Sequence, residues 1–96
     1  MIDVRQTAAF ASWLADLRDA GARARILVRI RRLELGNPGD AKSVGDGVSE
    51  LRIAYGPGYR VYFARRGQEI VILLCGVDKS SQGCDIATAK HMAREL

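Results

Sequence analysis

The chain has 96 residues, of which 48% are hydrophobic and 27% are charged, and its formal net charge is +4. This length predicts a single domain over residues 1–96, and the composition excludes an intrinsically disordered chain. No apolar run approaches the roughly 18 residues that a membrane span requires, so a membrane-spanning helix is excluded. The first ten residues lack the basic start and apolar core of a signal peptide. We therefore expect a cytoplasmic protein with no membrane partner.

The N-terminal segment combines a short strand pattern with a helical pattern. Residues 2–5 predict a short strand. From Thr7, which we expect to cap a helix, apolar residues recur at helical spacing and predict one buried stripe. The members of this stripe are Phe10, Trp13, Leu14 and Leu17. The sequence of residues 19–21, Asp-Ala-Gly, is expected to end this helix.

A second helix is predicted to begin near Ala22 and to end at the turn sequence of residues 36–40. Its buried stripe consists of Ile26, Ile30 and Leu33, with Leu27 at the edge. A neighbouring face carries Arg25, Arg29 and Arg32. Two helices joined by a tight turn predict a helical hairpin.

The positive charge is concentrated in this second helix. Residues 22–35 contain five arginines and one glutamate, whereas the basic and acidic residues elsewhere balance each other. Such a stripe indicates an anionic partner, either nucleic acid or an acidic protein segment, and the alternative is an ordinary solvated helix face. Arginine suits bidentate contacts with phosphate or carboxylate better than lysine does, which favours a partner.

Two alternating segments, residues 48–55 and 59–65, predict a β-hairpin around the turn sequence Gly-Pro-Gly. Pairing Tyr55 with Tyr59 places the apolar side chains on one face, because side chains alternate along a strand. This core face holds Leu51, Ile53, Tyr55, Tyr59, Val61 and Phe63. The opposite face is basic and aromatic and holds Glu50, Arg52, Ala54, Arg60, Tyr62 and Ala64.

Residues 70–75 are apolar on both faces and predict a central strand, whose register the pattern does not fix. Cys75 in this strand is expected to be a core residue, and two cysteines are too few for a disulfide scaffold. Ser80 or Ser81 is expected to cap a final helix. Together the elements predict an α+β fold, in which an N-terminal helical hairpin packs on one face of a small, mostly antiparallel sheet with a C-terminal helix.

The basic face of the hairpin is a candidate anion site. Arg52 and Arg60 lie on adjacent strands, and Lys79 follows the next strand. Guanidinium groups stabilise charge on phosphoryl oxygens when the 2′-hydroxyl of RNA attacks its own phosphate, a reaction that needs no metal. Tyr62 adds a ring for a base or a hydroxyl for a phosphate oxygen. Glu50 is either a proton acceptor or a salt-bridge partner, and the alternative for the whole face is a solvated surface with ordinary cross-strand pairs.

The chain offers no spacing typical of metal ligands, since it has one histidine and only two cysteines. No metal and no cofactor are therefore expected.

Residues 36–63, with their ELRI and YGPGYRVYF sequences, are similar to the phage-derived, Gp49-like branch of the RelE/HigB toxin superfamily, also called addiction-module killer proteins. The DKS sequence at residues 78–80 and the arginine-rich second helix fit the same resemblance, which covers nearly the whole chain. The resemblance implies a RelE-like fold for the single domain.

The resemblance also implies a function: the toxin of a type II toxin–antitoxin system. Such a toxin is a metal-independent endoribonuclease that cleaves mRNA on the translating ribosome and is neutralised by a cognate antitoxin. The antitoxin of this branch is usually a helix-turn-helix protein, through which alone the pair binds operator DNA. Matching the family motifs implies catalytic roles for Arg52, Arg60 and Lys79. RNA-binding roles are expected for Tyr62, Lys42, Arg25, Arg29 and Arg32.

Two departures from the family pattern support an alternative function. Glu50 stands where RelE has a lysine, and the tyrosine that follows the last strand of RelE has no counterpart here. The alternative is a non-catalytic partner of a helix-turn-helix antitoxin, which modulates repression of the operon.

Overall fold

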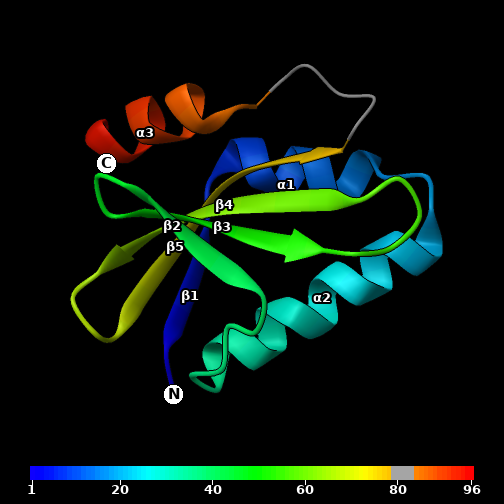
Figure 1. Ribbon diagram of the computed structural model, residues 1–96, viewed down its shortest axis with the longest axis horizontal. Helices are drawn as coiled ribbons and strands as arrows, with labels where there is room; N and C mark the ends of the chain where they lie inside the picture. Colours follow the sequence, from blue (N-terminus) through cyan, green and yellow to red (C-terminus); the bar gives the residue numbers. More distant parts are fainter. Residues whose placement is uncertain (79–83) are drawn as a thin grey trace.

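The computed structural model describes residues 1–78 and 84–96, which form a mixed α+β fold with a five-stranded sheet and three helices (Figure 1). In chain order the elements are β1 (Asp3–Gln6), α1 (Ala8–Asp16), α2 (Ala20–Glu34), β2 (Ala41–Gly45), β3 (Val48–Ile53), β4 (Tyr59–Arg66), β5 (Ile70–Asp78) and α3 (Ile86–Arg94). The strand order is β1-β5-β4-β3-β2, and all pairs are antiparallel except β1 with β5. None of the described helices is long and apolar enough to cross a membrane.

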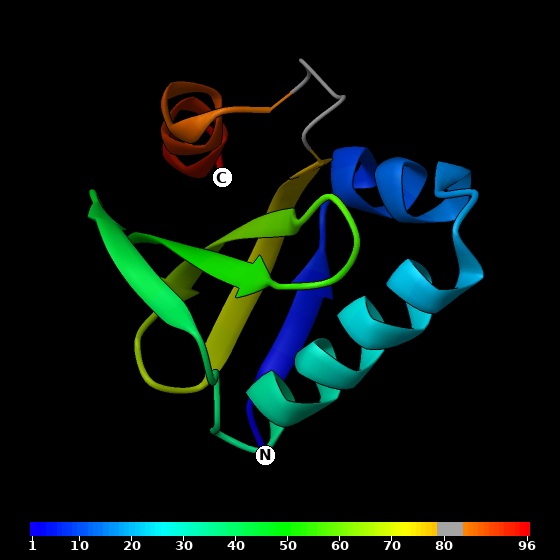
Figure 2. The same ribbon diagram turned by 45° about the vertical axis from the view of Figure 1, so that its right-hand side comes forward.

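Helices cover both faces of the sheet, an arrangement that differs from the predicted one. Helices α1 and α2 lie against one face, and α3 lies alone against the other (Figure 2). The first buried cluster joins Phe10 and Ile26 to the inward side chains of the central strands. The second cluster contains Tyr62 together with Ala89 and Ala93 of α3. The face of the sheet that was predicted to be basic and aromatic is thus partly covered by α3.

Capping side chains determine where the three helices begin. The hydroxyl of Thr7 accepts a hydrogen bond from the amide three residues later, as predicted for the first helix. Asp19 does the same for α2, so it begins the second helix and the prediction that it ends the first is wrong. Asp85 caps α3, in place of Ser80 or Ser81, which lie outside the described residues.

The β3–β4 hairpin has the predicted faces but not the predicted pairing. Ile53 lies opposite Tyr59, so the register is shifted by two residues from the expected pair of Tyr55 with Tyr59. A shift of two leaves every side chain on its predicted face, because the side-chain period of a strand is two. Tyr55 falls in the loop, where Gly56 and Gly58 have φ angles of 56° and 91° that glycine readily adopts.

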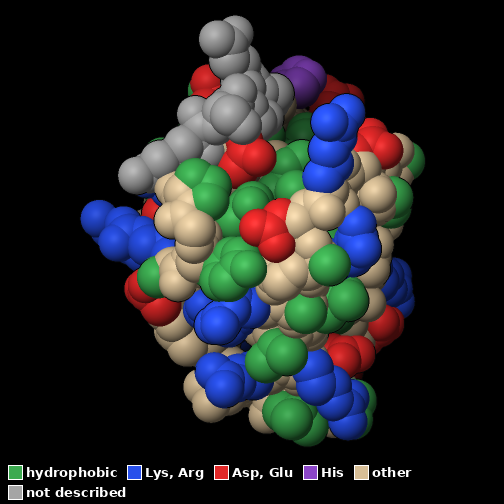
Figure 3. Space-filling model, turned by 90° about the vertical axis from the view of Figure 1, so that its right-hand side faces the viewer, with side chains coloured by type: hydrophobic (Ala, Val, Ile, Leu, Met, Phe, Trp, Pro, Cys, Tyr) green, Lys and Arg blue, Asp and Glu red, His purple; other side chains and the backbone are tan. Residues whose placement is uncertain are grey.

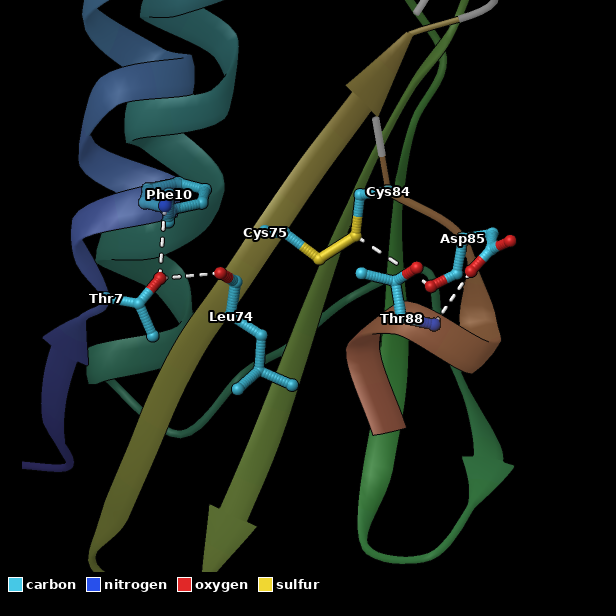
Figure 4. Close-up of a disulfide and its surroundings, with 7 residues drawn as sticks. All are labelled: Thr7, Phe10, Leu74, Cys75, Cys84, Asp85 and Thr88. Atoms are coloured by element: carbon cyan, nitrogen blue, oxygen red, sulfur yellow. Dashed lines mark hydrogen bonds between the residues drawn. A yellow bond between two sulfur atoms is a disulfide. The ribbon is translucent and has the colours of Figure 1, made fainter. Parts of the chain in front are cut away.

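A β-bulge at Leu74 sets the register of β5, which the sequence pattern left open. Adjacent residues of β4 pair with Leu73 and with Cys75, so Leu74 is an extra residue in the ladder. Because of the bulge, the neighbouring side chains of Leu74 and Cys75 both join the cluster beneath α3. The hydroxyl of Thr7 donates to the carbonyl of Leu74 at 2.6 Å and thereby satisfies a bulged backbone group (Figure 4).

Cys75 and Cys84 form a disulfide that joins β5 to the segment leading into α3 (Figure 4). Cys75 is buried, as predicted, but its pairing with Cys84 was not expected. The two residues are nine positions apart, and their Cα atoms are 6.2 Å apart. The cross-link holds the start of α3 next to the end of β5, and this is the edge of the site described below.

Candidate active site

A cleft of about 400 Å³ lies where the ends of β3, β4 and β5 approach the beginning of α3. It opens on the face of the sheet that α3 covers in part, on the side opposite the helical hairpin. We call it the arginine cleft. Its lining includes the polar residues Arg52, Arg60, Tyr59, Tyr62, Asp40, Asp78 and Asp85.

Arg52 and Arg60 are direct cross-strand partners in the β3–β4 hairpin. Since residues directly opposite each other point to the same face, both guanidinium groups belong to the same cleft. Their side chains are 47% and 58% exposed, so both are open to a ligand. Like charges at directly opposite positions repel each other, and this pair therefore favours a nearby anion.

Glu50 supplies a counter-charge from within the protein. Its side chain is only 5% exposed, and its Oε1 accepts a hydrogen bond from Nε of Arg52 at 2.7 Å. The same oxygen is 4.0 Å from Nε of Arg60. The hydrogen bond and charge of Glu50 raise the pKa of Arg52 above its ordinary value. Of the two roles weighed for Glu50, the structure shows the ion-pair role: the buried carboxylate is hydrogen-bonded to Arg52 and lies within ion-pair distance of Arg60.

Tyr62 lies in the floor of the cleft and is 2% exposed. The ring is therefore covered in this structure, and the RNA-binding role of Tyr62 stays a prediction. Burial raises the pKa of its hydroxyl, the charge of Glu50 adds to this effect, and the hydrogen bond with Arg60 opposes it. Tyr62 is therefore a neutral floor residue that supports the two charged side chains above it.

The other predicted site residues do not join this cleft in the part of the chain that the structure describes. Lys79 lies outside the described residues. Lys42 is exposed on the edge strand β2 and does not line the cleft. Arg25, Arg29 and Arg32 surround a second groove on the side of the sheet that α2 covers.

The side chain of Arg29 links α2 to the backbone of the loop before β2 and of β3. Its Nη1 donates to the carbonyl of Arg52 at 2.5 Å. Its Nη2 donates to the carbonyls of Pro38 and Asp40 at 3.0 and 3.1 Å. The half-buried guanidinium of Arg29 is thus occupied by the carbonyl groups of Arg52, Pro38 and Asp40, and its RNA-binding role stays a prediction.

Three carboxylates of the cleft wall were not predicted as site residues. Asp40 precedes β2, Asp78 ends β5, and Asp85 caps α3, so only the tertiary fold brings them together. Hydrogen bonds from Thr88 lower the pKa of Asp85. Among the residues that the structure describes, no cluster of three or more histidine, cysteine or acidic side chains could hold a metal ion.

The sequence was compared with known protein families and curated proteins. The profile of the phage-derived Gp49-like family (DUF891) matches residues 12–95. The chain belongs to this family. The Gp49-like family is related to toxin–antitoxin systems. This Gp49-like chain is also 53% identical over 95 residues to an uncharacterized protein of Haemophilus influenzae, and the match covers 99% of the chain and 96% of the relative.

Proposed function

We propose that this Gp49-like protein is a RelE-like toxin, an endoribonuclease that cleaves mRNA on the translating ribosome in the cytoplasm. A cognate helix-turn-helix antitoxin neutralises it. The observation that carries the proposal is the pair of opposed arginines, Arg52 and Arg60, which form ion pairs with the buried Glu50 in an open cleft. Family membership adds the expectation of a toxin with an antitoxin partner.

The proposed reaction uses the nucleophile that RNA itself carries. The 2′-oxygen attacks the adjacent phosphorus while the bond to the 5′-oxygen breaks, which leaves a 2′,3′-cyclic phosphate and a 5′-hydroxyl. Negative charge grows on the phosphoryl oxygens, and Arg52 and Arg60 stabilise it. A carboxylate of the cleft wall accepts the proton of the 2′-hydroxyl, and a water molecule donates a proton to the leaving 5′-oxygen. This route requires no metal ion, since the guanidinium groups supply the positive charge.

The test is induction of the protein alone in bacteria, followed after a few minutes by mapping of mRNA 5′ ends. Wild type, Arg60→Ala and Arg65→Ala are compared at equal soluble levels. Arg65 is the matched control, because it is an exposed arginine of the same strand that lies outside the cleft. We expect new ends in translated regions with wild type and Arg65→Ala, and their loss with Arg60→Ala.

Other outcomes would redirect the proposal. Cleavage retained in Arg60→Ala would leave a nuclease whose centre lies elsewhere. No cleavage by folded wild type would contradict the nuclease and favour the non-catalytic partner of an antitoxin. A synthetic RNA with a single 2′-deoxynucleotide at the mapped site checks the chemistry, because cleavage there must stop when the 2′-hydroxyl is missing.

A further inference from the structure

A second groove, of about 670 Å³, runs along α2 on the side of the molecule opposite α3. We call it the α2 groove. One wall is α2, and the other is the end of β3 with the residues that follow it. In the lower half of Figure 3, hydrophobic side chains lie between basic ones on this side of the molecule. Its lining includes Arg25, Val28, Arg29, Arg32, Ala54 and Tyr55.

The charge that α2 offers to a partner is smaller than its sequence indicates. Arg23 donates to the carbonyl of Leu17, and Arg31 donates to Glu34 of the same helix. Arg29 is held by three backbone carbonyls. The exposed arginines that line the groove are therefore Arg25 and Arg32, which do not form the dense row of cations that a phosphate backbone requires.

Apolar surface lies between these two arginines. Val28 is 52% exposed and lines the groove together with Ala24 and Ala54. The guanidinium of Arg25 is already placed over the ring of Tyr55, 4.7 Å from its centre. A nucleic acid would contact the charges and leave the aliphatic side chains uncovered. A protein segment that carries both carboxylates and apolar side chains would cover both kinds of surface.

The two grooves meet at one residue. Ala54 lines the α2 groove on one side and the arginine cleft on the other. A chain that lies in the α2 groove can therefore continue past Ala54 and reach Arg52 and Arg60. A carboxylate placed there would occupy the position that we assign to the scissile phosphate.

We propose that the α2 groove binds an acidic, amphipathic segment of the antitoxin, and that the continuation of this segment past Ala54 closes the arginine cleft with a carboxylate. The closing of the cleft rests on the proposed nuclease function, whereas the docking on α2 does not. The partner is thus defined by its chemistry: apolar side chains meet Val28, and carboxylates meet Arg25 and Arg32.

The experiment uses the full chain and the purified product of the reading frame next to its gene, with binding measured by calorimetry. Val28→Asp and Arg32→Glu are the test variants. Ala11→Asp and Arg94→Glu are matched controls, because they introduce the same acidic side chains at exposed helical positions outside the groove. We expect each test variant to weaken binding by about 30-fold or more, and each control to change it by less than about twofold.

Circular dichroism and urea unfolding show whether each variant is folded. Unchanged binding by folded Val28→Asp and Arg32→Glu would overturn the proposal, and so would failure of the partner to bind wild type. If Arg32→Glu lost binding to the ribosome but still bound the partner, the groove would be assigned to RNA, and this result would also overturn the proposal. Failure of the nuclease proposal can be told apart from failure of the docking proposal. In that case wild type does not cleave mRNA, but the pattern of partner binding is unchanged.

Discussion

The Nε atom of Arg52 donates to the buried carboxylate of Glu50 at 2.7 Å, while 47% of the arginine side chain remains exposed. One end of the side chain is thus fixed in the interior and the other is open to the cleft. A guanidinium that is already oriented loses less conformational entropy when it meets a phosphate. In the proposed reaction Glu50 is therefore a positioning residue that acts through Arg52.

Replacing Glu50 by Gln tests this positioning role. Glu50→Gln keeps the shape of the side chain but removes the charge that orients Arg52, so we expect kcat to fall by up to about 100-fold. The KM for RNA should not rise, because the cleft becomes more positive. Steady-state cleavage of a synthetic mRNA bound to ribosomes measures both constants. A purely structural role would instead lower the stability and the active fraction without changing KM or kcat per folded molecule.

The hydrogen bonds of Arg29 predict a large difference between two neighbouring arginines of α2. Arg29→Ala removes three bonds from a charged donor to backbone carbonyls and should lower the free energy of unfolding by about 2–3 kcal/mol. Arg25→Ala removes one exposed contact with the ring of Tyr55 and should cost about 1 kcal/mol or less. Urea unfolding of both variants measures the difference. Equal losses would contradict the structural role of Arg29.

The ring of Trp13 leaves no room for a side chain at position 76. A Cβ atom at position 76 would overlap Trp13 Cε3 and Cζ3, which belong to a rigid ring. Gly76→Ala should therefore destabilise the protein by about 1–3 kcal/mol, the usual cost of overpacking. Thermal unfolding is the measurement, and the double variant Gly76→Ala with Trp13→Leu is the control. If the overlap is the cause, the alanine costs less in the Trp13→Leu background than in wild type.

Burial of Tyr62 predicts a loss of stability at alkaline pH. Because its pKa is raised in the folded protein, the folded state holds this proton more tightly than the unfolded state does. The resulting stability is fully present below the ordinary pKa of 10.0 and is lost as the pH rises through the folded value. Tyr59, whose pKa is also raised chiefly by burial, acts in the same direction.

Urea unfolding between pH 8 and pH 11 tests this expectation. Tyr62→Phe should make the free energy of unfolding fall less steeply with pH above 10 than it does in wild type. An identical pH dependence in the two proteins would show that the hydroxyl of Tyr62 titrates equally in the folded and unfolded states.

The helices and the central hairpin could be predicted because their patterns are strong. The buried stripe of α2, formed by Ile26, Ile30 and Leu33, follows directly from helical spacing, and its burial is confirmed. The faces of β3 and β4 were predicted for the same reason, since a register error of two residues moves no side chain to the other face. The joint location of Arg52 and Arg60 was predictable on this basis.

Strand β2 was missed because an edge strand has little pattern to detect. Its five residues, Ala41–Gly45, include no buried side chain, and it is paired with β3 alone. Lys42 and the nearby Asp40 therefore had no assigned position relative to the cleft. Local sequence gives no direct signal for such pairing, because the hydrogen bonds of an edge strand involve only the backbone.

The burial of Tyr62 was missed for a different reason. Alternation along β4 shows which face a side chain occupies, but not what covers that face. Helix α3 covers this face of β4, and its small residues Ala89 and Ala93 belong to the same buried cluster as Tyr62. The disulfide between Cys75 and Cys84, which fixes the approach to this helix, also joins segments that no local pattern relates.

The parallel pairing of β1 with β5 has a consequence for the synthesis of the protein. The paired residues Asp3 and Ile70 are 67 positions apart, and β5 separates β1 from the rest of the sheet. A nascent chain therefore lacks both this inner strand and Asp85 of the cleft wall until β5 and the start of α3 have been made. Under the proposed nuclease function, the site is thus assembled only after these two late segments have been synthesised.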